Sequence, residues 1–192
     1  MLEYHKSLEL NTPSESILYF GDSHIQGLLV QAINPASVNF GIGTDTTEGL
    51  LRRLPTYKSI KNAKAIVILI GANDLDYRDA QQVIANYQKI VYLLKQQIGE
   101  ETPLIFNGIF PVDESISNET GRNERALFIN RWLENYARTN AGVYFVDIYD
   151  KLIDERNSLN FNYHVGDGVH LNSRANAIWI EVLKQKLILL GN

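Results

Sequence analysis

Short apolar runs alternate with longer amphipathic stretches along the whole chain, and the two patterns predict different elements. Five runs of β-branched, aliphatic and aromatic residues predict strands at residues 17–21, 37–41, 64–71, 104–110 and 143–148. The third run contains AIVILIG, a sequence without a polar interruption. An apolar run of this kind is typical of a strand whose two faces are both buried.

Helices are predicted between the strands, where apolar residues recur every three or four positions. One such stripe runs over residues 83–98, a second lies near 122–139, and a third covers 173–190. Asn172 or Ser173 is a suitable N-cap for the last helix. Strand followed by helix, repeated along the chain, favours a parallel sheet covered by helices on both sides.

The predicted fold is therefore a three-layer α/β/α sandwich of flavodoxin-like type, with a central parallel sheet of about five strands. The 192 residues are expected to form one domain, with residues 1–15 as an N-terminal extension of unassigned role. In such sheets, ligands bind beyond the carboxyl ends of the strands. The polar segment 111–121 follows a predicted strand and is expected to border the site.

Composition narrows the classes of function. A formal net charge of −4 gives no broad basic surface, so nucleic acid is not expected as a partner. The chain has no cysteine, which excludes disulfides, thiolate metal sites and a cysteine nucleophile. No apolar run has the length of a signal peptide or a membrane span, so a cytoplasmic protein is expected. The oligomeric state is left open.

Polar residues gather where the predicted strands end, in the four stretches GDSH (21–24), GIGTDT (41–46), GAND (71–74) and GDGVHLN (166–172). Acyl transfer needs a hydroxyl nucleophile, an imidazole base, a carboxylate that orients the base, and donors for the oxyanion. Ser23, His170, Asp167 and Asn73 are candidates for these roles, in that order, and the turn after the second strand offers backbone N–H groups.

These four stretches together resemble the sequence blocks of the SGNH hydrolases, the GDSL-type esterases and lipases. GDSH resembles the GDSL block, NFGIGTDTTEGLLRRL (39–54) the glycine block, GANDL (71–75) the GxND block, and DGVHLN (167–172) the DxxH block. The blocks occur in the family's order. The resemblance implies an α/β/α serine esterase that needs neither a cofactor nor a metal.

Carried over position by position, the resemblance implies a role for each matching residue. Ser23 would be the nucleophile and also a backbone oxyanion donor, Asn73 the side-chain oxyanion donor, His170 the base and Asp167 its partner.

Two positions depart from the family pattern. His24 stands where leucine is usual, and Thr44 stands where the family has its oxyanion glycine. The Thr44 N–H, or that of Gly43, would be the remaining oxyanion donor. Threonine adopts a positive φ only at a cost, so this turn must either have ordinary geometry or carry strain.

Several other interpretations compete with this one. Asp22-Ser23-His24 also has the D-x-H spacing of binuclear metallophosphoesterases, but the further histidine motifs of such a site are missing. GIGTDT does not match the dinucleotide-binding pattern G-x-G-x-x-G. His164 is a second candidate base, and a non-catalytic binding module with the same fold is a further alternative.

The expected substrate is a small-molecule or glycan ester, with a short acyl group such as acetyl on a polar alcohol such as a carbohydrate. A lysophospholipase or thioesterase of the same family is the alternative. The preference rests on the absence of a large apolar lid and on a polar rim whose members are Asp113, Glu114, Ser115, Ser117, Asn118 and Glu119.

Overall fold

A computed structural model describes residues 3–99, 101–117 and 120–191 of the chain. Its centre is a five-stranded parallel sheet of β1 (Ile17–Gly21), β2 (Ser37–Gly41), β3 (Ala65–Leu69), β4 (Leu104–Asn107) and β5 (Val143–Val146). The strand order is β2-β1-β3-β4-β5, the order of flavodoxin-like folds. The predicted sheet is confirmed, although β3, β4 and β5 are shorter than their apolar runs.

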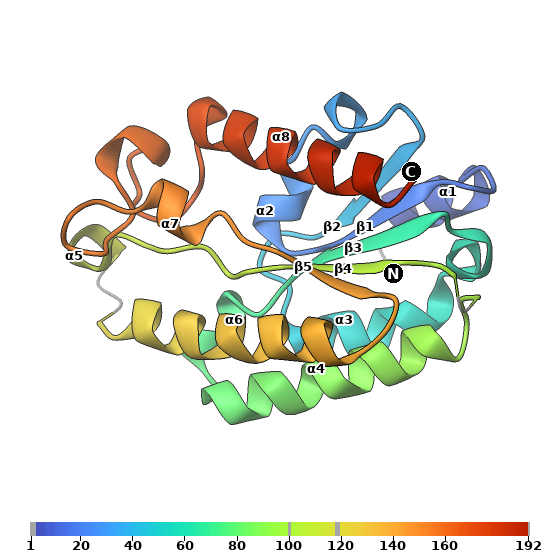
Figure 1. The fold of residues 1–192 in the computed structure, drawn as a ribbon, viewed down its shortest axis with the longest axis horizontal. Helices are drawn as coiled ribbons and strands as arrows, with labels where there is room; N and C mark the ends of the chain where they lie inside the picture. Colours follow the sequence, from blue (N-terminus) through green and yellow to red (C-terminus); the bar gives the residue numbers. More distant parts are fainter. Residues whose placement is uncertain (1–2, 100, 118–119, 192) are drawn as a thin grey trace.

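Helices cover both faces of this sheet (Figure 1). The helices α3 (Thr47–Arg53), α4 (Ala80–Lys95) and α6 (Arg122–Thr139) lie below it in the view of Figure 1, and α8 (Ser173–Leu189) and the short α2 (Ser23–Gln26) lie above it. The apolar residues accordingly divide into two cores, one on each face. All five residues of β1 and of β3 are buried, as expected of strands inside a doubly covered sheet.

The remaining elements are short, and most lie at the ends of the sheet. They are α1 (Glu3–Leu10), α5 (Glu114–Ser117), α7 (Tyr149–Leu152) and the 3-10 turns η1 (Val30–Ala32), η2 (Leu54–Thr56), η3 (Lys58–Asn62), η4 (Asn73–Asp76) and η5 (Phe161–Tyr163). α1 is part of the extension to which the sequence assigned no role. Its His5 is buried against Phe40 and Tyr57 and accepts or donates a 3.0 Å hydrogen bond with the Tyr57 hydroxyl.

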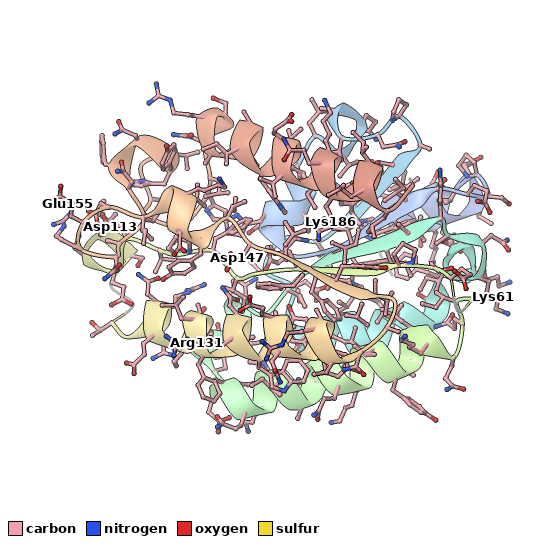
Figure 2. The ribbon with its side chains drawn as sticks, viewed as in Figure 1. Lys61, Asp113, Arg131, Asp147, Glu155 and Lys186 are labelled. Atoms are coloured by element: carbon pink, nitrogen blue, oxygen red, sulfur yellow. The ribbon has the colours of Figure 1, made fainter. Side chains whose placement is uncertain are left out.

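Side-chain sticks fill the space between the sheet and its helices on both faces (Figure 2). The N-cap predicted for the last helix is confirmed, because the Asn172 side chain accepts hydrogen bonds from the N–H groups of Arg174 and Ala175. None of the helices in the described ranges is both long and apolar enough to cross a membrane.

Candidate active site

Three side chains that are distant in the sequence form one chain of hydrogen bonds at the carboxyl end of β1. Ser23 Oγ lies 3.0 Å from His170 Nε2, and His170 Nδ1 lies 2.6 Å from Asp167 Oδ2. Ser23 is the first residue of α2, directly after β1, whereas Asp167 and His170 lie in the loop that leads into α8. The fold therefore brings together Ser23 and His170, which are 147 residues apart in the sequence.

The loop itself fixes the carboxylate of Asp167. Its Oδ1 accepts hydrogen bonds from the backbone N–H groups of Val169 and His170, both at 2.9 Å. Burial raises the pKa of Asp167, but the His170 ring and these two N–H groups outweigh that effect and lower the pKa to about 2. Asp167 is therefore ionised near neutral pH and can hold the proton of the adjacent His170 nitrogen.

His164, the second candidate base, is not part of this chain. It is buried, and its Nδ1 accepts hydrogen bonds from the N–H groups of Gly166 and Gly168 at 3.0 and 3.1 Å. Both glycines have positive φ, so the loop turns tightly around the imidazole. His164 thus shapes the loop that carries Asp167 and His170.

Asn73 and the turn after β2 lie together on the neighbouring strand ends. Asn73 Nδ2 donates to the backbone oxygen of Asp45 at 2.9 Å, which leaves its second amide hydrogen for another acceptor. Asp45 N donates to Ile42 O at 3.1 Å, which closes a turn over residues 42–45. Its third residue, Thr44, has φ of 62°.

The turn at Thr44 therefore carries strain and does not have ordinary geometry, which were the two possibilities for a threonine at this position. A β-branched residue in the left-handed region costs on the order of 1–3 kcal/mol, which the surrounding contacts must offset. In the described part of the chain, the backbone N–H groups of Thr44 and Gly43 donate to no backbone or side-chain acceptor. Among the described residues, both N–H groups are therefore open to a further acceptor.

Asp22 and Asp74, which flank the candidate residues, have structural contacts. The buried Asp22 carboxylate accepts from the His24 N–H at 3.0 Å and caps α2. The buried Asp74 carboxylate binds the N–H of Thr47 at 2.8 Å and so attaches the start of α3 to the end of β3. Among the described residues, no three His, Asp or Glu side chains gather as a metal site would require.

Two buried arginines support the site, and neither was predicted from the sequence. Arg53, in the last turn of α3, donates to the backbone oxygens of Gly21 (3.2 Å) and Phe40 (2.9 Å) and to Asp45 Oδ2 (2.8 Å). Arg122, at the start of α6, donates to the Ala72 oxygen at 2.9 Å. A sequence signal existed for Arg53 alone, because it lies within the glycine block (39–54) among leucines.

The described residues of the segment 111–121 border the site, as predicted, but Asp113 and Glu114 are engaged in hydrogen bonds within the segment or with the start of α6. Asp113 N donates to Gly168 O at 2.7 Å, so the segment packs on the loop of Asp167. The Asp113 carboxylate is buried and binds Ser115, while the Glu114 carboxylate accepts from the N–H groups of Gly121 and Asn123. Two of the predicted rim residues, Asn118 and Glu119, lie outside the described residues.

The chain thus combines a parallel sheet covered on both faces with a serine, a histidine and a carboxylate joined by hydrogen bonds beside β1. The sequence model of the GDSL-like lipase/acylhydrolase family matches residues 19–178, and the chain belongs to this family. It is therefore a hydrolase that acts on ester bonds. A search of curated proteins finds no match.

Solved structures agree with this assignment of the fold. A protein from Streptococcus pneumonia whose name refers to platelet activating factor is 25% identical, with a TM-score of 0.84 over 96% of this chain and 89% of that one. A GDSL-like lipase from Bacteroides thetaiotaomicron is 20% identical, with a TM-score of 0.81 over 96% of this chain and 94% of that one.

Proposed function

We propose that the protein is a serine esterase that works through an acyl-enzyme intermediate, with Ser23, His170 and Asp167 as its catalytic residues. The observation that carries the proposal is the hydrogen-bond chain from Ser23 Oγ through the His170 ring to Asp167. A hydroxyl becomes a nucleophile when a base accepts its proton, and an imidazole oriented by a carboxylate is such a base.

Each proton has a defined route in this scheme. His170 Nε2 removes the Ser23 proton while Ser23 Oγ attacks the ester carbonyl. The imidazolium then donates that proton to the departing alkoxide, which leaves as the alcohol. A water molecule, deprotonated by the same nitrogen, attacks the acyl-enzyme and releases the acid and Ser23.

The oxyanion of each tetrahedral intermediate needs donors that are already in position. We assign this role to the backbone N–H groups of Ser23 and Thr44 and to Asn73 Nδ2, with the Gly43 N–H as the alternative to that of Thr44. The hydrogen bond from Asn73 to Asp45 O supports the assignment, because it fixes the amide and leaves one N–H free.

The substrate we propose is a short acyl ester, an acetate, of a polar alcohol such as a carbohydrate. The Asp167 and His170 side chains are 43% and 48% exposed. Because His170 must reach the leaving alcohol, its exposure supports an alcohol that extends into solvent, as a sugar would.

The test is the hydrolysis of p-nitrophenyl esters, from acetate to palmitate, with and without EDTA. We expect turnover that is highest on the acetate, insensitive to EDTA, and reduced at least about 1,000-fold in Ser23→Ala. Ser7→Ala, which alters an exposed serine of α1, is the control and should behave as the wild type.

Three outcomes would contradict parts of this proposal. Undiminished turnover in Ser23→Ala would exclude Ser23 as the nucleophile. A profile that peaks at long acyl chains would favour a lysophospholipase. Activity that EDTA abolishes and that survives in Ser23→Ala would support a metal-dependent mechanism.

A further inference from the structure

His24 differs from the leucine usual in its sequence block, and its ring lies beside the His170 ring. It is the second residue of α2, where its backbone N–H is bound by Asp22. Its ring centroid lies 5.1 Å from that of Phe110, edge to face, and 5.6 Å from that of His170. Phe110 in turn packs on the buried Trp179, so buried aromatic side chains support the His24 ring.

The His24 ring has hydrogen-bonding capacity that the described part of the protein does not use. Neither ring nitrogen has a hydrogen-bond partner among the described residues, although the side chain is half-buried. Burial, followed by the charges of His170 and Arg122, lowers the pKa of His24, so the ring is neutral near pH 7. A neutral imidazole offers one donor and one acceptor.

The position of His24 beside His170 decides which part of a substrate it meets. In the proposed reaction, His170 Nε2 donates a proton to the leaving alkoxide, so the alcohol oxygen must lie within hydrogen-bond reach of that nitrogen. A ring packed against His170 therefore faces the alcohol portion of the ester. A leucine at this position would present only methyl groups to that alcohol.

We propose that His24 is a specificity-determining residue, which hydrogen-bonds a hydroxyl group next to the ester oxygen in the alcohol portion of the substrate. The proposal rests on the proposed serine mechanism and narrows its substrate class to esters of polyhydroxy alcohols. Polar groups that are partly withdrawn from water normally find partners, and a vicinal hydroxyl can serve both as donor and as acceptor.

The test compares two acetates whose alcohols have the same three-carbon skeleton, glycerol 1-acetate and n-propyl acetate, by titration of the acid released. We expect the wild type to prefer glycerol 1-acetate in kcat/KM. In His24→Leu the ratio of the two kcat/KM values should fall about tenfold, the value of one hydrogen bond of ordinary strength. His24→Gln, which retains a donor and an acceptor, should recover part of that ratio.

The alternatives predict different outcomes. If His24 only packs against His170, His24→Leu changes both kcat/KM values by the same factor, and the proposal is wrong. If the wild type has no preference for glycerol 1-acetate, the proposal is also wrong, while the serine mechanism stands. If the wild type cleaves neither acetate nor p-nitrophenyl acetate, the proposed function itself fails. Thermal melting of each variant confirms that it is folded.

Discussion

The carboxylate of Asp22 is the residue-scale feature with the clearest consequence for stability. It has no exposed surface, and its Oδ2 has no hydrogen-bond partner among the described residues. Burial raises the pKa of Asp22 to about 7, against the lowering effect of the His24 N–H and of the Arg122 and His170 charges; Asp45 raises it further.

The sign of the resulting pH dependence follows from proton uptake. An unfolded chain releases the Asp22 proton near pH 4, whereas the folded chain keeps it until about pH 7. The unfolded state therefore gains relative stability as the pH rises through this interval. The contribution of Asp22 to stability is full below about pH 4 and lost above about pH 7.

We predict that Asp22→Asn, which is neutral at every pH and can still cap α2, melts at a higher temperature than the wild type at pH 8. The difference in unfolding free energy should be on the order of 2–4 kcal/mol there and should shrink towards pH 4.5. Melting curves across this range test it, with the exposed N-cap variant Asp79→Asn as control. A difference independent of pH would contradict the argument.

At the scale of elements, Arg53 joins α3 to the ends of β1 and β2. Its side chain and that of its ion-pair partner Asp45 are only 8% and 9% exposed. Tyr57 OH also accepts from Arg53, so each of the three guanidinium nitrogens has an acceptor. Since Asp45 O holds the Asn73 amide, this ion pair connects the packing of a helix to the proposed oxyanion site.

We predict that Arg53→Met lowers the free energy of unfolding by about 3–5 kcal/mol, because it leaves the Asp45 carboxylate buried without its ion-pair partner. Arg52→Met is the matched control: Arg52 is adjacent, 77% exposed and paired with an exposed Glu48, so its loss should cost about 0.5 kcal/mol or less. Urea denaturation of the two variants measures the contrast. Equal costs would show that the Arg53 contacts are energetically unimportant.

At the scale of the whole molecule, the two cores share one five-stranded sheet. β3, for example, places Ile66 and Ile68 in one core and Ala65, Val67 and Leu69 in the other. Because the same strands carry both cores, disruption of the sheet disrupts both cores together. A single domain is therefore expected to unfold in one cooperative transition.

The two tryptophans report on opposite layers, because Trp132 packs with the core of α4 and α6, and Trp179 lies in the core of α8. We predict that Trp132→Phe and Trp179→Phe, each with one remaining tryptophan, show fluorescence transitions in urea that coincide with the loss of helical circular dichroism. Two separate transitions in either variant would mean that the layers unfold independently.

Local periodicity explains why most elements could be predicted. The stripe near 122–139 and the observed α6 have the same limits, and α8 begins where its N-cap predicted. Most of the short helices were not predicted, since four residues hold too little periodic pattern, although the turn at Gly21 and Ser23 did indicate the start of α2. β4 ends at Asn107, earlier than its apolar run, because the backbone N–H and C=O of Ile109 hydrogen-bond to the Asn130 side chain instead of to a neighbouring strand.

Hydrophobic spacing and short motifs are local properties of a chain, so the strand-forming runs, the long helices and the resemblance to the family could be read from the sequence. Only the folded structure shows the left-handed Thr44, the Arg53 ion pair and the position of the His24 ring beside His170. Each of these depends on groups far apart in the sequence that meet only when the sheet is assembled. A local sequence pattern does not show which distant groups will be neighbours. The geometry of the proposed active site depends on these long-range contacts.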